Sequence, residues 1–141
     1  TLSGREFSEF LGVPYAQPPK RFEPPLKAGK WNGTRIATVL GSKCGQFQPP
    51  DYFLGSEDCL VLNVHTPVLN FSLNEHVTLL PVLVFFHGGS FQNGGFWESF
   101  GPEYLMEQDL VYVAVNYRLG ALGFLSTGDG LVSGNNGLKD Q

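Results

Sequence analysis

Residues 81–95 read Pro-Val-Leu-Val-Phe-Phe-His-Gly-Gly-Ser-Phe-Gln-Asn-Gly-Gly, an apolar run that leads directly into a glycine-rich loop. Two further apolar runs, rich in β-branched residues, lie at 60–65 and 110–116. Continuous apolar runs of this length are typical of strands buried on both faces of an α/β sheet. Residues 102–108 begin with proline and glutamate, which favours a short helix between the last two strands. The sequence therefore predicts an α/β fold with a right-handed β-α-β unit.

The loop that follows the strand fits three familiar site patterns poorly. A phosphate-binding loop requires lysine where Gly95 stands, and the dinucleotide fingerprint spaces its glycines differently. The serine elbow pattern Gly-x-Ser-x-Gly begins at Gly88 but ends on Gln92. His87 is a poor base for Ser90, because the fold, and not proximity within one loop, brings triad members together.

The remaining interpretation of the loop is an oxyanion hole. Glycines after His87 allow the backbone to adopt unusual dihedral angles, so that successive N–H groups converge on one point. Loops of the His-Gly-Gly-Gly type perform this role after the third strand of some hydrolase sheets. The loop therefore indicates acyl-transfer chemistry, in which its amides stabilise a developing negative charge.

The composition indicates an ordered but incomplete domain. The chain has 141 residues, of which 42% are hydrophobic and only 16% are charged, against about 25% charged in a typical domain. A parallel sheet with apolar faces also requires more strands and covering helices than these runs supply. We therefore expect residues 1–141 to be an incomplete part of a larger domain, although the low charge alone would also fit one half of an assembly.

The charge of the chain is unevenly distributed. Residues 1–43 contain seven basic and three acidic residues, whereas 44–141 contain two basic and ten acidic ones. The basic residues form no run interleaved with aromatics, so a solvated basic face is favoured over nucleic-acid binding. No apolar run approaches the roughly 18 residues of a membrane-spanning helix.

The N-terminal part has fewer regular elements. Residues 1–13 alternate loosely around Ser3-Gly4, which predicts a short antiparallel hairpin. Residues 14–30 contain five of the ten prolines and one glycine, which favours an ordered coil.

Two cysteines and two acceptor patterns bear on the compartment. Cys44 and Cys59 stand alone without a C-x-x-C pair, which argues against zinc and leaves either a disulfide or two reduced thiols. Asn32-Gly-Thr and Asn70-Phe-Ser match the N-glycosylation pattern. Together these features favour a secreted or lumenal protein.

Five motifs in order resemble the type-B carboxylesterases, the carboxylesterase/cholinesterase family. They are Phe10-Leu-Gly-Val-Pro-Tyr-Ala-Gln-Pro-Pro19 with Arg21-Phe22, Ser56-Glu-Asp-Cys-Leu-Val-Leu-Asn-Val64, Phe86-His-Gly-Gly-Ser-Phe91, Asn116-Tyr-Arg-Leu-Gly120 with Gly123-Phe-Leu-Ser126, and Gly134-Asn-Asn-Gly-Leu-Lys-Asp-Gln141. The resemblance implies the N-terminal part of an α/β-hydrolase, with strands of a mixed, mainly parallel central sheet.

The resemblance assigns roles within the loop. In relatives, the backbone N–H groups at the positions of Gly89 and Ser90 form the oxyanion hole, together with the residue after the nucleophile. Ser90 departs from the commonest pattern, which has glycine there. If this position requires a positive φ, serine adds about 1 kcal/mol of strain. His87 is structural in such proteins.

The resemblance also implies contacts outside the loop. Cys44 and Cys59 align with the first disulfide of the family, and Arg21 with the arginine that forms a structural ion pair with Glu57. Arg118 aligns with an arginine whose acidic partner is expected beyond residue 141.

The resemblance implies a carboxylic-ester hydrolase that acts through a serine acyl-enzyme. The nucleophile, acid and histidine of the family lie beyond residue 141, so this chain alone is expected to be inactive. A small carboxylic ester is the implied substrate, with no cofactor and no metal, and the oligomeric state stays open. The loop between the cysteines lacks tryptophan, which disfavours a choline-ester specialist. The alternative is a non-catalytic, cholinesterase-like adhesion ectodomain of the cell surface.

Overall fold

A computed structural model describes residues 1–48, 50, 52–71, 79–96 and 101–141. Its strands are β1 (Ser8–Pro14), β2 (Gln46–Gln48), β3 (Tyr52–Leu54), β4 (Val61–Thr66), β5 (Val82–Phe86) and β6 (Val111–Val115). Its helices are a 3-10 helix, η1 (Leu105–Glu107), and two single-turn α-helices, α1 (Gly120–Phe124) and α2 (Asn136–Asp140).

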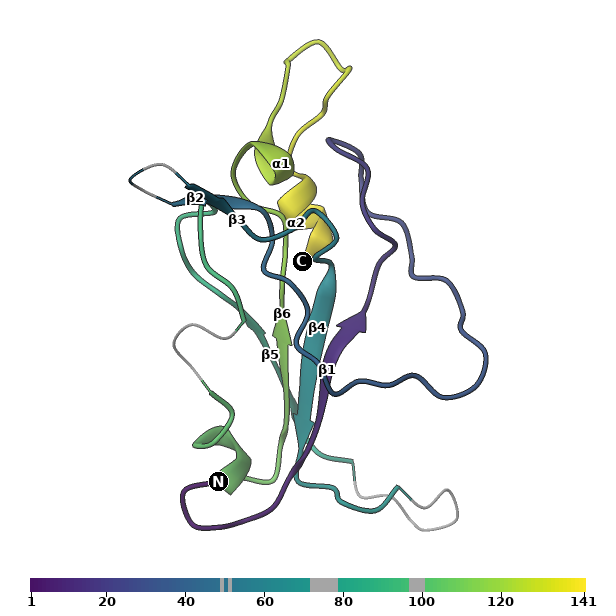
Figure 1. Ribbon diagram of the computed structural model, residues 1–141, viewed down its shortest axis with the longest axis vertical. Coiled ribbons are helices and arrows are strands. Elements are labelled where there is room, and N and C mark those ends of the chain that lie inside the picture. Colours follow the sequence, from purple (N-terminus) through teal and green to yellow (C-terminus); the bar gives the residue numbers. More distant parts are fainter. Residues whose placement is uncertain (49, 51, 72–78, 97–100) are drawn as a thin grey trace.

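The central sheet has four strands in the order β1-β4-β6-β5 (Figure 1). β1 and β6 are both antiparallel to β4, while β5 runs parallel to β6 with Val84 opposite Val113. The three strands predicted from apolar runs are therefore confirmed as β4, β5 and β6. The sheet is mixed, as predicted, although β5 and β6 are the only parallel neighbours within the described part of the chain.

A small antiparallel hairpin is present, but not at the N-terminus. A turn at Ser3-Gly4 is closed by the N–H of Gly4 and the carbonyl of Thr1 at 3.3 Å. Thr1 also donates to the carbonyl of Arg5 at 3.0 Å, but among the described residues the two arms form no strand pair, and β1 pairs with β4. The hairpin is instead β2 with β3, where Phe47 lies opposite Phe53.

The helix predicted at 102–108 is shorter than expected. Only η1 forms, preceded by a bond from the N–H of Met106 to the carbonyl of Pro102 at 2.8 Å. A single turn gains too few hydrogen bonds to offset helix nucleation, so packing decides its shape. Met106 is fully buried and packs against Tyr112 and Ala114 of β6.

Two apolar clusters form the core of the described residues. The first comprises Ala16, Cys44, Cys59, Leu60, Tyr117 and Leu119, and the second comprises Phe96, Met106, Tyr112 and Ala114. The predicted burial of β5 on both faces is not observed, since Val82 is 60% and Val84 48% exposed. Within the described residues, β5 is an edge strand with β6 as its neighbour.

The expected partner of Arg118 is corrected by the structure. The side chain pairs with Asp140 of α2, with Nη2 2.7 Å from Oδ1 and Nε 2.8 Å from Oδ2. The acidic partner therefore lies within the chain and not beyond residue 141. Nη1 also donates to the carbonyl of Glu23 at 2.7 Å. The pair is almost fully buried and fixes α2 against the segment after β6.

Candidate functional site

The glycine-rich loop leaves β5 at the carboxyl end of the sheet. Because β5 and β6 are parallel, the segments that follow them meet at one end, where α1, α2 and the hairpin also lie (Figure 1). The N–H of Gly120 donates to the carbonyl of Phe91 at 2.6 Å. The Phe91 ring packs against Phe124 of α1, with 5.0 Å between ring centroids. The loop is thus seated on the start of α1.

The backbone of the loop turns through three successive positive φ angles. They are 120° at Gly89, 54° at Ser90 and 59° at Phe91. A Cβ on Gly89 would overlap the carbonyl oxygen of Asn93, so only glycine fits there. The carbonyl of Gly89 accepts bonds from the N–H groups of Gln92 and Asn93 at 2.9 and 3.1 Å, which closes the turn.

This conformation leaves two amides available. Among the described residues, no atom accepts a hydrogen bond from the N–H of Gly89 or Ser90. Gly89 is partly exposed and Ser90 is exposed. Left-handed dihedrals cost a serine about 1 kcal/mol relative to its usual regions. The loop therefore holds strain at the residue whose side chain looked like a nucleophile.

His87 is buried at the start of the loop and packs beneath it. Its ring stacks on Tyr117, with centroids 4.5 Å apart and planes 17° from parallel. The Tyr117 hydroxyl donates to the carbonyl of His87 at 2.7 Å, and burial raises the pKa of that hydroxyl, so it remains a donor. Nδ1 of His87 lies 2.8 Å from the carbonyl oxygen of Gly88. These contacts attach the loop to the segment that follows β6.

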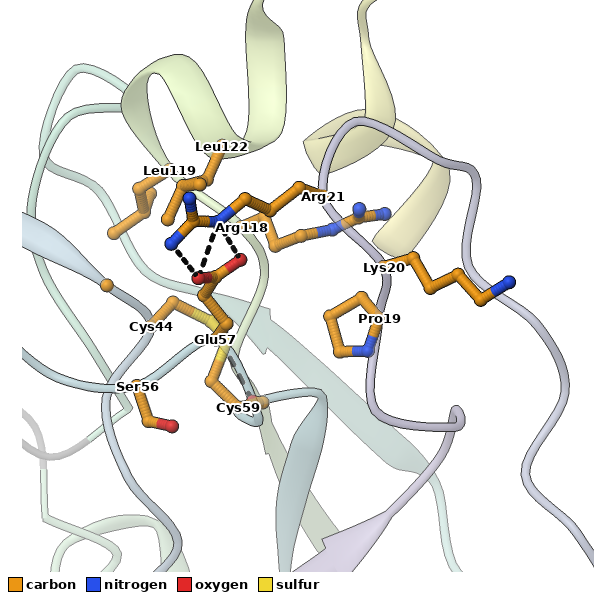
Figure 2. Close-up of a pocket in the computed structure, with 11 residues that line it drawn as sticks. Pro19, Lys20, Arg21, Cys44, Ser56, Glu57, Cys59, Arg118, Leu119 and Leu122 are labelled. Carbon is orange, nitrogen blue, oxygen red and sulfur yellow. Dashed lines mark hydrogen bonds and ion pairs between the residues drawn. A yellow bond between two sulfur atoms is a disulfide. The ribbon is translucent and has the colours of Figure 1, made fainter.

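The disulfide and the Arg21–Glu57 pair lie together below α1 (Figure 2). Cys44 and Cys59 are bonded and fully buried. Nε of Arg21 donates to both carboxylate oxygens of Glu57, at 2.7 and 2.9 Å. This hydrogen bonding holds the pKa of Glu57 below its usual range. The disulfide excludes the alternative of two reduced thiols, while the ion pair stays largely open to solvent.

The remaining candidate residues lie at the surface or outside the described residues. Asn32 and Asn70 are exposed, and Ser72, which completes the second acceptor pattern, lies outside the described part. In the described ranges, no group of His, Cys, Asp and Glu side chains is arranged to hold a metal ion. No described helix is both long and apolar enough to cross a bilayer.

One contact of the loop was not predicted from the sequence. Gln46, at the start of β2, is buried and exchanges hydrogen bonds with the backbone of Gly94. A glutamine two positions after Cys44 matches no site pattern that sequence reasoning uses. Only the fold shows that it reaches the loop.

Comparison with known proteins identifies the family to which the chain belongs. The carboxylesterase family matches residues 1–141, the whole of the chain. The chain belongs to the carboxylesterase family. Esterase E4 of Myzus persicae is 49% identical over all of this chain and 26% of its own length. The Neuroligin-like protein glit-1 of Caenorhabditis elegans is 43% identical over 94% of this chain and 19% of its own length.

A solved family structure supports the fold. The juvenile hormone esterase of Manduca sexta, with OTFP covalently attached, has a TM-score of 0.78 and 37% identity over 95% of this chain and 26% of that chain. The predicted α/β-hydrolase class is therefore confirmed. The chain spans about a quarter of the length of the family members it matches.

Proposed function

We propose that this chain is the N-terminal portion of a carboxylic-ester hydrolase with a serine acyl-enzyme mechanism. Residues 1–141 would form the first part of one incomplete α/β-hydrolase domain. Two facts support this proposal: the chain matches about a quarter of each esterase, and β5 has an apolar, exposed surface. Further strands and helices of the same domain would cover that surface.

The observation that best supports an ester-hydrolase role is the pair of available amides at Gly89 and Ser90. In the proposed reaction a serine oxygen, from beyond residue 141, attacks the ester carbonyl carbon. The C=O electrons move onto oxygen, and the two N–H groups donate to that oxyanion. Collapse expels the alcohol and leaves an acyl-enzyme, which water hydrolyses to acid and free serine. Each oxyanion donor is worth on the order of 10²–10³ in rate.

His87 acts as scaffold in this scheme. Its ring is stacked on Tyr117, and its Nδ1 contacts the adjacent carbonyl of Gly88. The triad, with its own histidine, would come from the part of the protein beyond residue 141.

The substrate would be a small carboxylic ester, and the compartment secreted or lumenal. The disulfide Cys44–Cys59 supports an oxidising compartment. Asn32 and Asn70 are exposed and accessible to glycosylation. Each would carry an N-glycan.

A non-catalytic, cholinesterase-like adhesion ectodomain is the second candidate. The 43% identity to a Neuroligin-like protein favours it, and Ser90 departs from the glycine that is commonest at this position of the oxyanion loop. The two candidates differ at the nucleophile position of the full-length protein. A serine inside Gly-x-Ser-x-Gly favours the hydrolase, and its replacement favours adhesion.

Hydrolysis of a short-chain nitrophenyl ester tests the proposal. The full-length protein is expected to release nitrophenol in a burst followed by a slower steady rate, as an acyl-enzyme accumulates. The 141-residue chain alone is expected to show no such turnover. A full-length protein without hydrolysis, or an isolated chain as fast as the full-length protein, would refute it.

A further inference from the structure

We propose that Gln46 is a positioning residue that sets the geometry of the oxyanion loop. This inference rests on the proposed hydrolase function and deepens it. Gln46 would touch neither the substrate nor the reacting atoms. It would act through Gly94, which packs against the first residues of the loop, His87 and Gly88.

The Gln46 side chain binds one residue of the loop through both of its polar atoms. Oε1 accepts from the N–H of Gly94 at 2.9 Å, and Nε2 donates to the carbonyl of the same residue at 2.7 Å. Nε2 also donates to the carbonyl of Cys44 at 3.0 Å. The side chain is only 3% exposed, so these bonds have little competition from water. The side-chain amide of Gln46 therefore binds both the N–H and the carbonyl of Gly94.

Gly94 connects these hydrogen bonds to the residues that precede the proposed oxyanion donors. Its φ is 120°, and a Cβ there would come within 2.5 Å of Nδ1 of His87 and 2.6 Å of the carbonyl oxygen of Gly88. Its backbone is thus packed directly against the two residues that precede Gly89. A shift of Gly94 would release these residues, and the N–H vectors of Gly89 and Ser90 would follow.

The disulfide fixes the backbone on the Gln46 side of these hydrogen bonds. Cys44, whose carbonyl accepts from Gln46, is buried and bonded to Cys59 next to β4. The side-chain amide therefore links a cross-linked part of the core to the end of a glycine-rich turn. Of the common side chains of this size, only an amide both donates to and accepts from the backbone of one residue. A carboxylate accepts but does not donate, and leucine does neither.

The test compares Gln46→Glu and Gln46→Leu in the full-length protein, with Gln48→Glu and Gln48→Leu as matched controls. Gln48 is on the same strand, and its Oε1 accepts from the exposed Tyr52 hydroxyl at 3.0 Å. For the two Gln46 variants we expect kcat for a nitrophenyl ester to fall by about 10- to 100-fold, less than loss of an oxyanion donor. KM should stay within about threefold, since the substrate's ground state is bound elsewhere. The affinity for a trifluoromethyl ketone, which forms a tetrahedral adduct, should fall in proportion to kcat.

The pH profile separates positioning from a merely structural role. A protonated glutamate regains one donor, so the ratio of Gln46→Glu activity to wild-type activity should rise as pH falls. The ratio for Gln46→Leu should not depend on pH. Thermal unfolding midpoints check that the variants are folded.

Retention of kcat and ketone affinity within twofold in folded Gln46 variants would overturn the inference. A wild-type protein without esterase activity would overturn the proposed function alone. In that case ¹⁵N-glycine spectra decide the inference: the Gly88, Gly89 and Gly94 signals should move in Gln46→Leu and stay in Gln48→Leu. Unmoved signals in Gln46→Leu would reject the positioning role.

Discussion

At the residue scale, the decisive feature is the backbone of Ser90. Its φ of 54° and its neighbours' positive φ angles are those of a tight turn that presents N–H groups. A serine hydroxyl contributes nothing to that geometry. The distinction between nucleophile and backbone donor can therefore be tested by removing the side chain.

Ser90→Gly is expected to keep esterase activity in the full-length protein, because both amide donors remain. The free energy of unfolding should change by less than about 1 kcal/mol, since relief of the left-handed strain is offset by a more flexible unfolded chain. Nitrophenyl ester hydrolysis and urea unfolding measure the two effects. A loss of activity of about 10³-fold or more would show that Ser90 itself attacks the substrate.

His65 on β4 is expected to make stability depend on pH. Its side chain is buried, stacks on Tyr112 and lies opposite Glu9, with Nδ1 3.4 Å from Oε2. Burial lowers the pKa of His65, while the Glu9 and Glu103 carboxylates oppose that shift. The unfolded chain therefore binds the proton more readily, and the free energy of unfolding should fall as pH drops below about 6.5.

Urea unfolding of the full-length protein between pH 8 and pH 5 measures this effect. The His65 contribution has a slope of at most about 1.4 kcal/mol per pH unit. His65→Gln should remove it and flatten the curve relative to wild type. Identical curves for the two proteins would show that His65 is not the responsible group.

At the scale of elements, two ion pairs join separate segments with very different strength: Arg118–Asp140 joins α2 to the segment after β6, and Arg21–Glu57 joins two loops. Arg118–Asp140 is buried and bidentate, whereas Arg21–Glu57 is largely exposed. Asp140→Asn leaves a buried guanidinium uncompensated and should cost about 3–5 kcal/mol of unfolding free energy. Glu57→Gln should change stability little, because solvent screens the pair. Equal losses for the two variants, measured by urea unfolding, would contradict this assignment.

The disulfide holds the loop that contains β2, β3 and Gln46. Cys44 and Cys59 are 15 positions apart. Replacing both with serine should lower the free energy of unfolding by about 3 kcal/mol in the chain-entropy account. Urea unfolding of the double variant against wild type measures the loss. Unchanged stability, or two reactive thiols in the native protein, would argue against the bond.

The elements also show what local sequence can predict. β4, β5 and β6 were predictable because short apolar runs that are rich in β-branched and aromatic residues and bounded by turn residues favour strands. The helix at 102–108 was overestimated, because propensity says little about one isolated turn whose shape depends on burying Met106. Asp140 was not predicted as the partner of Arg118 although it lies within the sequence, because only tertiary packing brings α2 beside the segment after β6.

At the scale of the whole molecule, one part of the candidate site could be predicted from the sequence and another part could not. The position of Gly89 and Ser90 followed from an apolar strand entering a glycine-rich loop and from a family resemblance. The role of Gln46 did not, because the contact joins positions 48 residues apart and depends on how the disulfide loop folds. The exposed faces of β5 agree with a chain that matches about a quarter of its relatives.

The most direct test of the central claim is a crystal structure of the full-length protein bearing a trifluoromethyl ketone adduct. We predict that the ketone carbon is bonded to a serine beyond residue 141. The adduct oxygen should lie about 2.7–3.1 Å from the backbone nitrogens of Gly89 and Ser90. A covalent bond to Oγ of Ser90, or an adduct oxygen out of reach of both nitrogens, would contradict the account.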